Sequence, residues 1–251
     1  MRSPHHTATA LESAPVHGSA PATQTRALRV VGATALALAA SLAVQNAVVL
    51  WARAPSYAAP IEEVLAFHAE HRGAVAIAVG LEAVNLPLLL GFLAGLHGMA
   101  VRRGGAGADW SRLALAAGAT LSAVFALYAV LWNGVVLAAG RLTEPSPELE
   151  LVWQLHAGAF ALALPALGTT FIGAALAAHR SRLTPPWQRL LGVVGGALLI
   201  AGGSANLAIA DGSSLLFVGL PGYAAWLVWL VATGIQLVRA RPGLTGTTGI
   251  G

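Results

Sequence analysis

The chain contains no cysteine and no lysine, and charged residues of either sign are scarce. The lack of cysteine excludes disulfides, thiolate nucleophiles and cysteine-ligated zinc or iron–sulfur sites. Charged residues make up 10% of the sequence, whereas a typical soluble domain carries about 25%. Because 57% of the residues are hydrophobic, the chain cannot cover itself with polar surface, and membrane lipid is its expected solvent and partner.

Long apolar runs take the place of the missing charge. They lie near residues 30–50, 74–101, 113–139, 152–178, 190–210 and 215–238. Each run reaches the roughly 20 residues that cross about 30 Å of hydrocarbon. Lipid offers the backbone no hydrogen bonds, so such spans are helical. The predicted fold is therefore all-α, a polytopic membrane bundle of six transmembrane helices.

The basic residues are all arginine, and most of them fall in alternate connections between the runs. These are Arg26, Arg29, Arg102, Arg103, Arg112, Arg180, Arg182, Arg189, Arg239 and Arg241. The other connections collect Glu62, Glu63, Glu70, Glu144, Glu148, Glu150 and Asp211. The positive-inside rule then places both termini in the cytoplasm. This placement also accounts for the net charge of +4, so no nucleic-acid partner is expected.

The composition divides the chain into three parts. Residues 1–27 are rich in Pro, Ser, Thr and Ala and lack apolar periodicity, which predicts a disordered cytoplasmic tail. Residues 28–240 form the predicted transmembrane domain, and residues 241–251 a second disordered tail. The use of arginine alone, together with abundant Ala and Gly, indicates a bacterial chain, and hence the cytoplasmic (inner) membrane.

One carboxylate lies inside a predicted span. Glu82 is eight residues into the second run, roughly 12 Å from its outer end at 1.5 Å per residue. Asn85 is three residues further on, which places it on the same helix face. An ionised carboxylate facing lipid would cost at least about 2.5 kcal/mol. Glu82 is therefore expected to face the bundle interior, as a proton carrier or general acid.

Other polar residues occur at a similar depth in the remaining runs. The predicted ligand-binding residues are Asn85, Asn133, His156, Asn206 and Tyr223. Together with Glu82 they predict a polar pocket that opens outward and handles a small molecule, an ion or a proton. Asn and Tyr side chains also link neighbouring helices as structural glue, and that interpretation stays open for each of them.

Three further functions compete with the pocket. The first is an intramembrane enzyme acting on a lipid or isoprenoid, similar to a terpene cyclase, with Glu82 and Asp211 as acids. The second is a structural or signalling partner without a small ligand. The third is a bis-histidine haem protein, in which His71 would pair with His156 and His97 with His179. The sequence leaves open whether the protein is an enzyme, and no cofactor or metal is expected.

Three stretches carry a resemblance. They are "GLEAVNLPLLLG" (80–91), "LTPPWQRLLGVVGGALLIAGG" (183–203) and "LPGYAAWLVWLVATGIQLVRA" (220–240). Together they resemble uncharacterised six-helix integral membrane proteins of bacteria, a domain of unknown function. The resemblance implies the six-span fold and an inner-membrane location over roughly residues 28–240. It implies no activity and no site residues.

Overall fold

The computed structural model describes residues 21–141 and 146–240, and all regular elements in these residues are helices. In chain order they are α1 (Pro21–Ala52), α2 (Ile61–Glu70), α3 (Arg72–Arg103), α4 (Ala106–Ala139), α5 (Pro147–Arg180), α6 (Pro186–Gly203), α7 (Asn206–Ala210) and α8 (Leu216–Arg239). The predicted all-α fold is confirmed. Helix α1 begins seven residues before the predicted boundary at residue 28, while the rest of the predicted N-terminal tail and the C-terminal tail lie outside the described residues.

Five of the described helices are long and apolar enough to cross a membrane: Thr23–Ala52 within α1, and α3, α4, α5 and α8. The predicted run 190–210 is divided in the structure. Its helix α6 has 18 residues and begins with the polar turn Pro186–Arg189. It ends at Gly203, where the Ser204 hydroxyl donates to the Ala201 carbonyl at 2.7 Å. The five residues of α7 follow.

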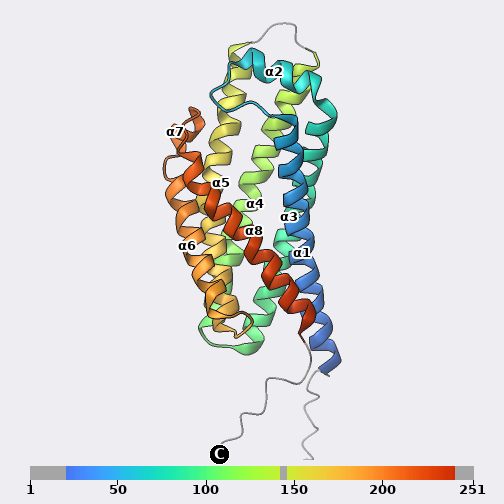
Figure 1. Cartoon of the computed structure of the whole chain (residues 1–251), viewed down its shortest axis with the longest axis vertical. Helices are drawn as coiled ribbons and strands as arrows, with labels where there is room; N and C mark the ends of the chain where they lie inside the picture. Colours follow the sequence, from blue (N-terminus) through green and yellow to red (C-terminus); the bar gives the residue numbers. More distant parts are fainter. Residues whose placement is uncertain (1–20, 142–145, 241–251) are drawn as a thin grey trace, which may run out of the picture.

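The long helices form a closed ring in which each packs on its two neighbours, in the order α1, α3, α4, α5, α6, α8 and back to α1. Helix α8 crosses the face of the bundle diagonally in Figure 1. Prolines 87, 165 and 221 lie inside α3, α5 and α8, and these helices continue through them. These prolines therefore do not divide α3, α5 or α8.

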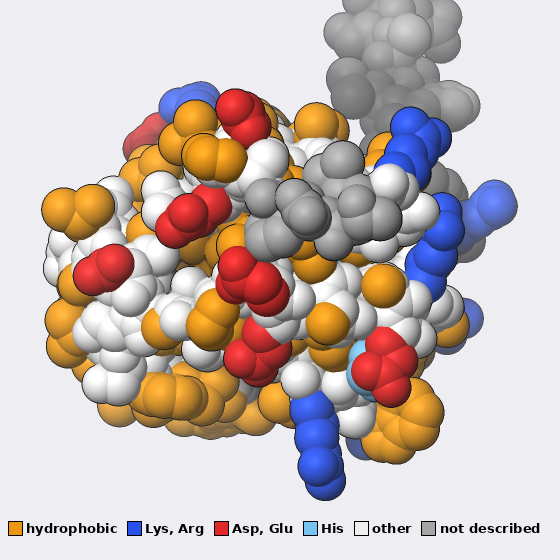
Figure 2. All heavy atoms as spheres, turned by 90° about the horizontal axis from the view of Figure 1, so that it is seen from above, with side chains coloured by type: hydrophobic (Ala, Val, Ile, Leu, Met, Phe, Trp, Pro, Cys, Tyr) orange, Lys and Arg blue, Asp and Glu red, His pale blue; other side chains and the backbone are white. Residues whose placement is uncertain are grey.

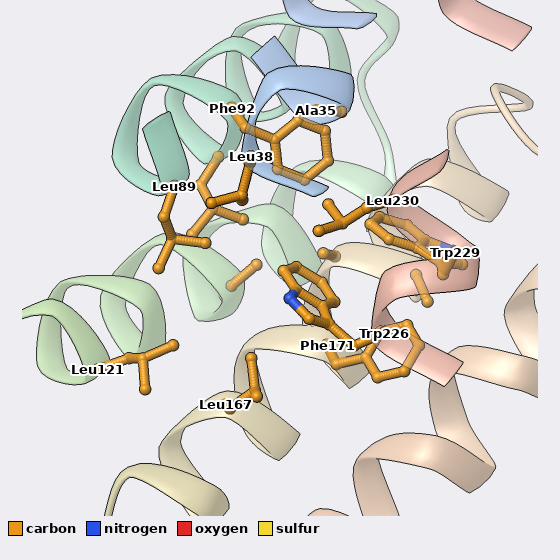
Figure 3. Close-up of a cluster of buried hydrophobic side chains, with 14 of the residues drawn as sticks. Ala35, Leu38, Leu89, Phe92, Leu121, Leu167, Phe171, Trp226, Trp229 and Leu230 are labelled. Atoms are coloured by element: carbon orange, nitrogen blue, oxygen red, sulfur yellow. The ribbon is translucent and has the colours of Figure 1, made fainter. Parts of the chain in front are cut away.

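The core lies where α1, α3, α5 and α8 meet. Phe92, Phe171, Trp226 and Trp229 pack there, and the two tryptophan rings stack at 5.6 Å between centroids (Figure 3). In a membrane, such packing would stabilise the bundle through close van der Waals contact, because lipid offers no burial from water.

The two ends of the bundle carry opposite charge. We call the end formed by α2, the start of α5 and the end of α7 the acidic end. Its exposed carboxylates are Glu62, Glu63, Glu70, Glu148, Glu150 and Asp211, and Figure 2 shows that face. The other end, the arginine end, holds the arginines of the α3–α4 and α5–α6 connections. Helix α2 lies across the acidic end (Figure 1).

Candidate functional site

Glu82 faces the interior, as predicted from the sequence, and is 5% exposed. It belongs to a hydrogen-bonded set, the Glu82 triad, formed by Glu82 and Asn85 of α3 and Gln45 of α1. Gln45 Nε2 donates to Glu82 Oε2 at 2.6 Å and to the Ala78 carbonyl at 3.1 Å. Gln45 Oε1 accepts from Asn85 Nδ2 at 2.7 Å. The triad thus joins two spans through a side chain from each.

The triad is short of positive charge and of donors. Within residues 21–141 and 146–240, the only ion pair is the exposed Arg112–Asp109 contact at the arginine end. Asn85 Oδ1 is buried and has no hydrogen-bond partner among the described residues. A buried carboxylate and a buried, unpartnered amide oxygen on one helix face would both be satisfied by a proton or a small cation.

Tyr223 lies close to the triad but is not bonded to it. Its hydroxyl accepts a hydrogen bond from Asn46 Nδ2 at 2.8 Å, and this bond links α8 to α1. Glu82 is near enough to act electrostatically on the hydroxyls of both Tyr223 and Tyr128. Hydrogen bonds therefore join α1 to α3 at the carboxyl, and a neighbouring bond joins α1 to α8.

His156, proposed above as a partner of Glu82, bonds elsewhere. Its ring is stacked between Tyr128, at 4.1 Å between centroids, and Trp153, at 5.0 Å. Its Nδ1 donates to the backbone carbonyl of Tyr128 at 3.2 Å. Three more aromatic side chains, Tyr57, Trp132 and Phe160, pack beside these rings. A second histidine, His68, completes this aromatic cluster.

Asn133 and Asn206 are not brought to the triad. Asn133 is exposed on α4, and Asn206 is half-buried at the first position of α7. Neither side chain forms a hydrogen bond with another described residue. For Asn133 the reason is rotational: the neighbouring Trp132 takes the inward position on α4, so the next side chain points outward.

The acid and histidine pairs of the alternative functions are also placed. Asp211 is exposed at the end of α7, while Glu82 is buried between α1 and α3. His71 stacks on Phe67 at 4.8 Å, and His97 Nδ1 donates to the Ser111 hydroxyl at 2.8 Å, since that hydroxyl's own hydrogen goes to Ala108. His179 lies against the Thr184 carbonyl. The two acids of the enzyme alternative thus lie in different surroundings, and the haem alternative stays a prediction.

A small cavity of about 10 Å³ lies between the triad and the acidic end. This volume admits one water molecule at most. It is lined by apolar side chains and by Trp132, with Phe67 of α2 on one side. Ala78, whose carbonyl accepts from Gln45, also lines it. The cavity therefore has Phe67 of α2 on one side and Ala78, the backbone partner of Gln45, on the other.

Sequence reasoning did not assign Gln45 to the site, although the amide pair Gln45 and Asn46 within an apolar run was a signal for it. It also missed a polar pair near the arginine end. Gln188 of α6 and Thr233 of α8 are fully buried, and Thr233 Oγ1 donates to Gln188 Oε1 at 3.4 Å.

No family model, curated protein or solved structure matches the chain. The resemblance stated from the sequence stays a prediction.

Proposed function

We propose that this chain is a multi-pass membrane protein that binds a proton or a small cation at Glu82. One observation carries the proposal: a buried carboxyl, without an ion-pair partner among the described residues, lies one helical turn from the unpartnered Asn85 Oδ1. When protonated, Glu82 can donate a hydrogen bond, and Asn85 Oδ1 is an available acceptor. When the proton leaves, the carboxylate retains the bond from Gln45 Nε2.

The protonated state can therefore form a bond to Asn85 Oδ1 that the ionised carboxylate, which cannot donate, lacks. An ion takes the proton's place in the same scheme, because carboxylate and amide oxygens are ligands for hard cations. The bonds from Gln45 connect this change on α3 to α1, and Asn46–Tyr223 connects α1 to α8. Binding of a proton or cation at Glu82 is thus coupled to the packing of α1, α3 and α8.

The proposal includes six crossings, with α6 and α7 together as the fifth. Helix α5 ends at the arginine end and α8 begins at the acidic end, so the chain between them must return across the bundle. The 18 residues of α6 extend about 27 Å at 1.5 Å per residue, and α7 adds the remaining length. Helix α6 also fills the position between α5 and α8 that closes the ring.

We further propose that the arginine end is cytoplasmic, in the inner membrane of a bacterium. A reporter that fluoresces only in the cytoplasm is expected to be bright when inserted between Gly104 and Gly105, or when fused after Arg239. Both glycines have positive φ and open space around them, so an insertion there is tolerated. The same reporter inserted at Ser146 is expected to be dark. Fluorescence at Ser146 with silence at Gly104 would reverse the orientation.

The test of the site uses dicyclohexylcarbodiimide, an apolar reagent that adds to protonated carboxyls. In the detergent-solubilised protein, labelling is expected at Glu82, located by mass spectrometry of the peptide, and it is expected to increase from about pH 8 to about pH 5. Glu82→Gln keeps the shape and loses the carboxyl, so this variant should not be labelled there. A water-soluble carbodiimide is the control, because it should label the exposed glutamates of α2 instead.

Added Na⁺ or K⁺ separates the two ligands. Protection of Glu82 by one of these ions identifies a cation site, while labelling that is indifferent to both identifies a proton site. Complete absence of labelling at Glu82 in folded protein, in buffer free of either ion, would contradict the proposal.

A further inference from the structure

Helix α2 is held to the acidic end by two buried side chains. Val64 is fully buried against Val135, Leu149 and Trp153. His68, one turn further along α2, is 2% exposed and lies edge-on to the Trp153 ring at 5.9 Å. Ile61, Leu65 and Phe67 are half-buried against the bundle. The other five residues of the helix are exposed: Glu62, Glu63, Ala66, Ala69 and Glu70. The attachment of α2 therefore depends on a small number of contacts.

The hydrogen bonds of His68 require its neutral form. The indole N–H of Trp132 lies 2.9 Å from His68 Nε2, and an indole nitrogen can only donate. Nε2 must then be the unprotonated acceptor. Nδ1 carries the ring hydrogen and donates it to the Val64 carbonyl at 2.6 Å. A proton added at Nε2 would face the Trp132 N–H donor to donor, and this bond would be lost.

The surroundings of His68 also disfavour its charged form. Burial lowers the pKa of His68 below its ordinary value of 6.5, against a smaller opposite effect of the Val64 carbonyl. The titratable group nearest to act on it is His156 from α5, and Tyr57 from the loop before α2 and Tyr128 from α4 pack against His156. His71, which follows α2 directly, is half-buried. The carboxylates of α2 and of the first turn of α5 are exposed, so they do not hold a charged imidazole in place.

Trp132 connects α2 to the Glu82 triad. It donates to His68 on one side and lines the small apolar cavity on the other. Phe67, next to His68 in α2, lines the same cavity. Ala78 lies at the cavity's inner side, and its carbonyl binds Gln45 Nε2. Displacing α2 would remove Phe67 from the cavity and free Trp132, which would open a route from the acidic end toward Glu82.

We propose that α2 is a pH-responsive cover over this route, and that protonation of His68 releases it from the acidic end. The release of α2 is independent of the proposed function, and only the role of the opening, access to Glu82, rests on it. Since neutral His68 is favoured in the docked state, docking is fully stable above about pH 6.5 and weakens as the pH falls from there toward the lowered pKa of His68. A single linked proton changes the docking equilibrium by at most about tenfold per pH unit.

The absence of cysteine permits a direct test. Val64→Cys places a thiol under the docked helix, and Ala69→Cys places one on its exposed face. Both variants are reacted with 4,4′-dithiodipyridine, which modifies thiols in acid. The reaction rate of the Val64→Cys protein divided by that of the Ala69→Cys protein is expected to rise up to about tenfold per pH unit below about pH 6.5. A ratio that stays constant would overturn the proposal.

Two histidine variants identify the group that titrates. His68→Gln can still accept from Trp132 but has no titratable group, so the ratio should stay low at every pH. His156→Gln should retain the pH response. A response that survives His68→Gln would overturn the assignment. If Val64→Cys itself undocks the helix, amide hydrogen exchange of residues 61–70 replaces the thiol reaction. It is measured against pH in the chain without added cysteine, with and without His68→Gln.

The response should also persist in Glu82→Gln, because the carboxyl takes no part in the attachment of α2. If the rate ratio is constant but Glu82 is labelled by the carbodiimide, the proposal for α2 is contradicted and the proposed site at Glu82 is retained. If the ratio depends on pH but Glu82 is not labelled, the proposed site is contradicted and the proposal for α2 is retained.

Discussion

Gly168→Val is expected to lower the free energy of unfolding of the detergent-solubilised protein by about 2 kcal/mol or more. A Cβ on Gly168 would lie 2.5 Å from the Gly196 carbonyl oxygen and 2.8 Å from Ile200 Cγ1. The first of these atoms is helix backbone, which cannot rotate away as a long side chain can. Helices α5 and α6 would have to separate, and the contacts that stabilise them in lipid depend on close approach.

Gly158→Val is the matched control, because Gly158 lies on the same helix and a Cβ there would meet nothing within 4 Å. Both variants place a β-branched residue in α5, so that contribution cancels in the comparison. Thermal unfolding in one detergent measures the difference. Equal melting temperatures for the two variants would show that α5 and α6 do not approach as closely as described.

Gln45→Leu is expected to lower the free energy of unfolding by about 1–3 kcal/mol, because it removes the partner of two buried groups at once. Glu82 Oε2 loses its donor, and Asn85 Nδ2 loses its acceptor. The control on the same helix is Ser41→Ala, since the Ser41 hydroxyl is buried without a hydrogen-bond partner among the described residues. Its removal should leave the stability unchanged or slightly raised.

The variant in which Gln45, Glu82 and Asn85 are all replaced by leucine distinguishes function from structural glue. Replacing all partners of a buried polar set by apolar groups is nearly neutral when the polar set contributes little net stability. We expect this triple variant to recover most of the stability lost in Gln45→Leu. If the triple variant stays as unstable as Gln45→Leu, the triad is retained for packing, and the argument for a proton or cation site at Glu82 loses its basis.

The sequence predicted the inward position of Glu82 but not its partner. The energetic cost of a carboxylate in lipid applies to any arrangement of the helices, so it could be used without knowing the fold. The pairing with Gln45 depends on how α1 is rotated against α3. His156 shows the same limit: its depth matched that of Glu82, while the packing of α4 and α5 directs its ring between Tyr128 and Trp153.

The predicted fifth run, residues 190–210, is divided at two glycines that pack closely against other helices. Gly202 and Gly203 have weak helix propensity, and each is in close contact with another helix. A Cβ on Gly203 would lie 2.9 Å from Leu164 Cβ, and one on Gly202 would lie 2.9 Å from the Gly219 nitrogen. Hydropathy depends only on residue type and not on contacts with Leu164 or Gly219. Residues 190–210 are therefore predicted from the sequence as a single span.

By itself, the sequence determined which segments are helical and apolar, and which connections carry arginine or carboxylate. These properties depend on residue type and on the thickness of the hydrocarbon layer, which are the same whatever the helices touch. Only the tertiary structure decided the ring order, the place of α2 across the acidic end and the choice of hydrogen-bond partners. Gln45 and Glu82 are 37 residues apart, and the rotation of each helix about its axis, which brings them together, is set by packing against its neighbours.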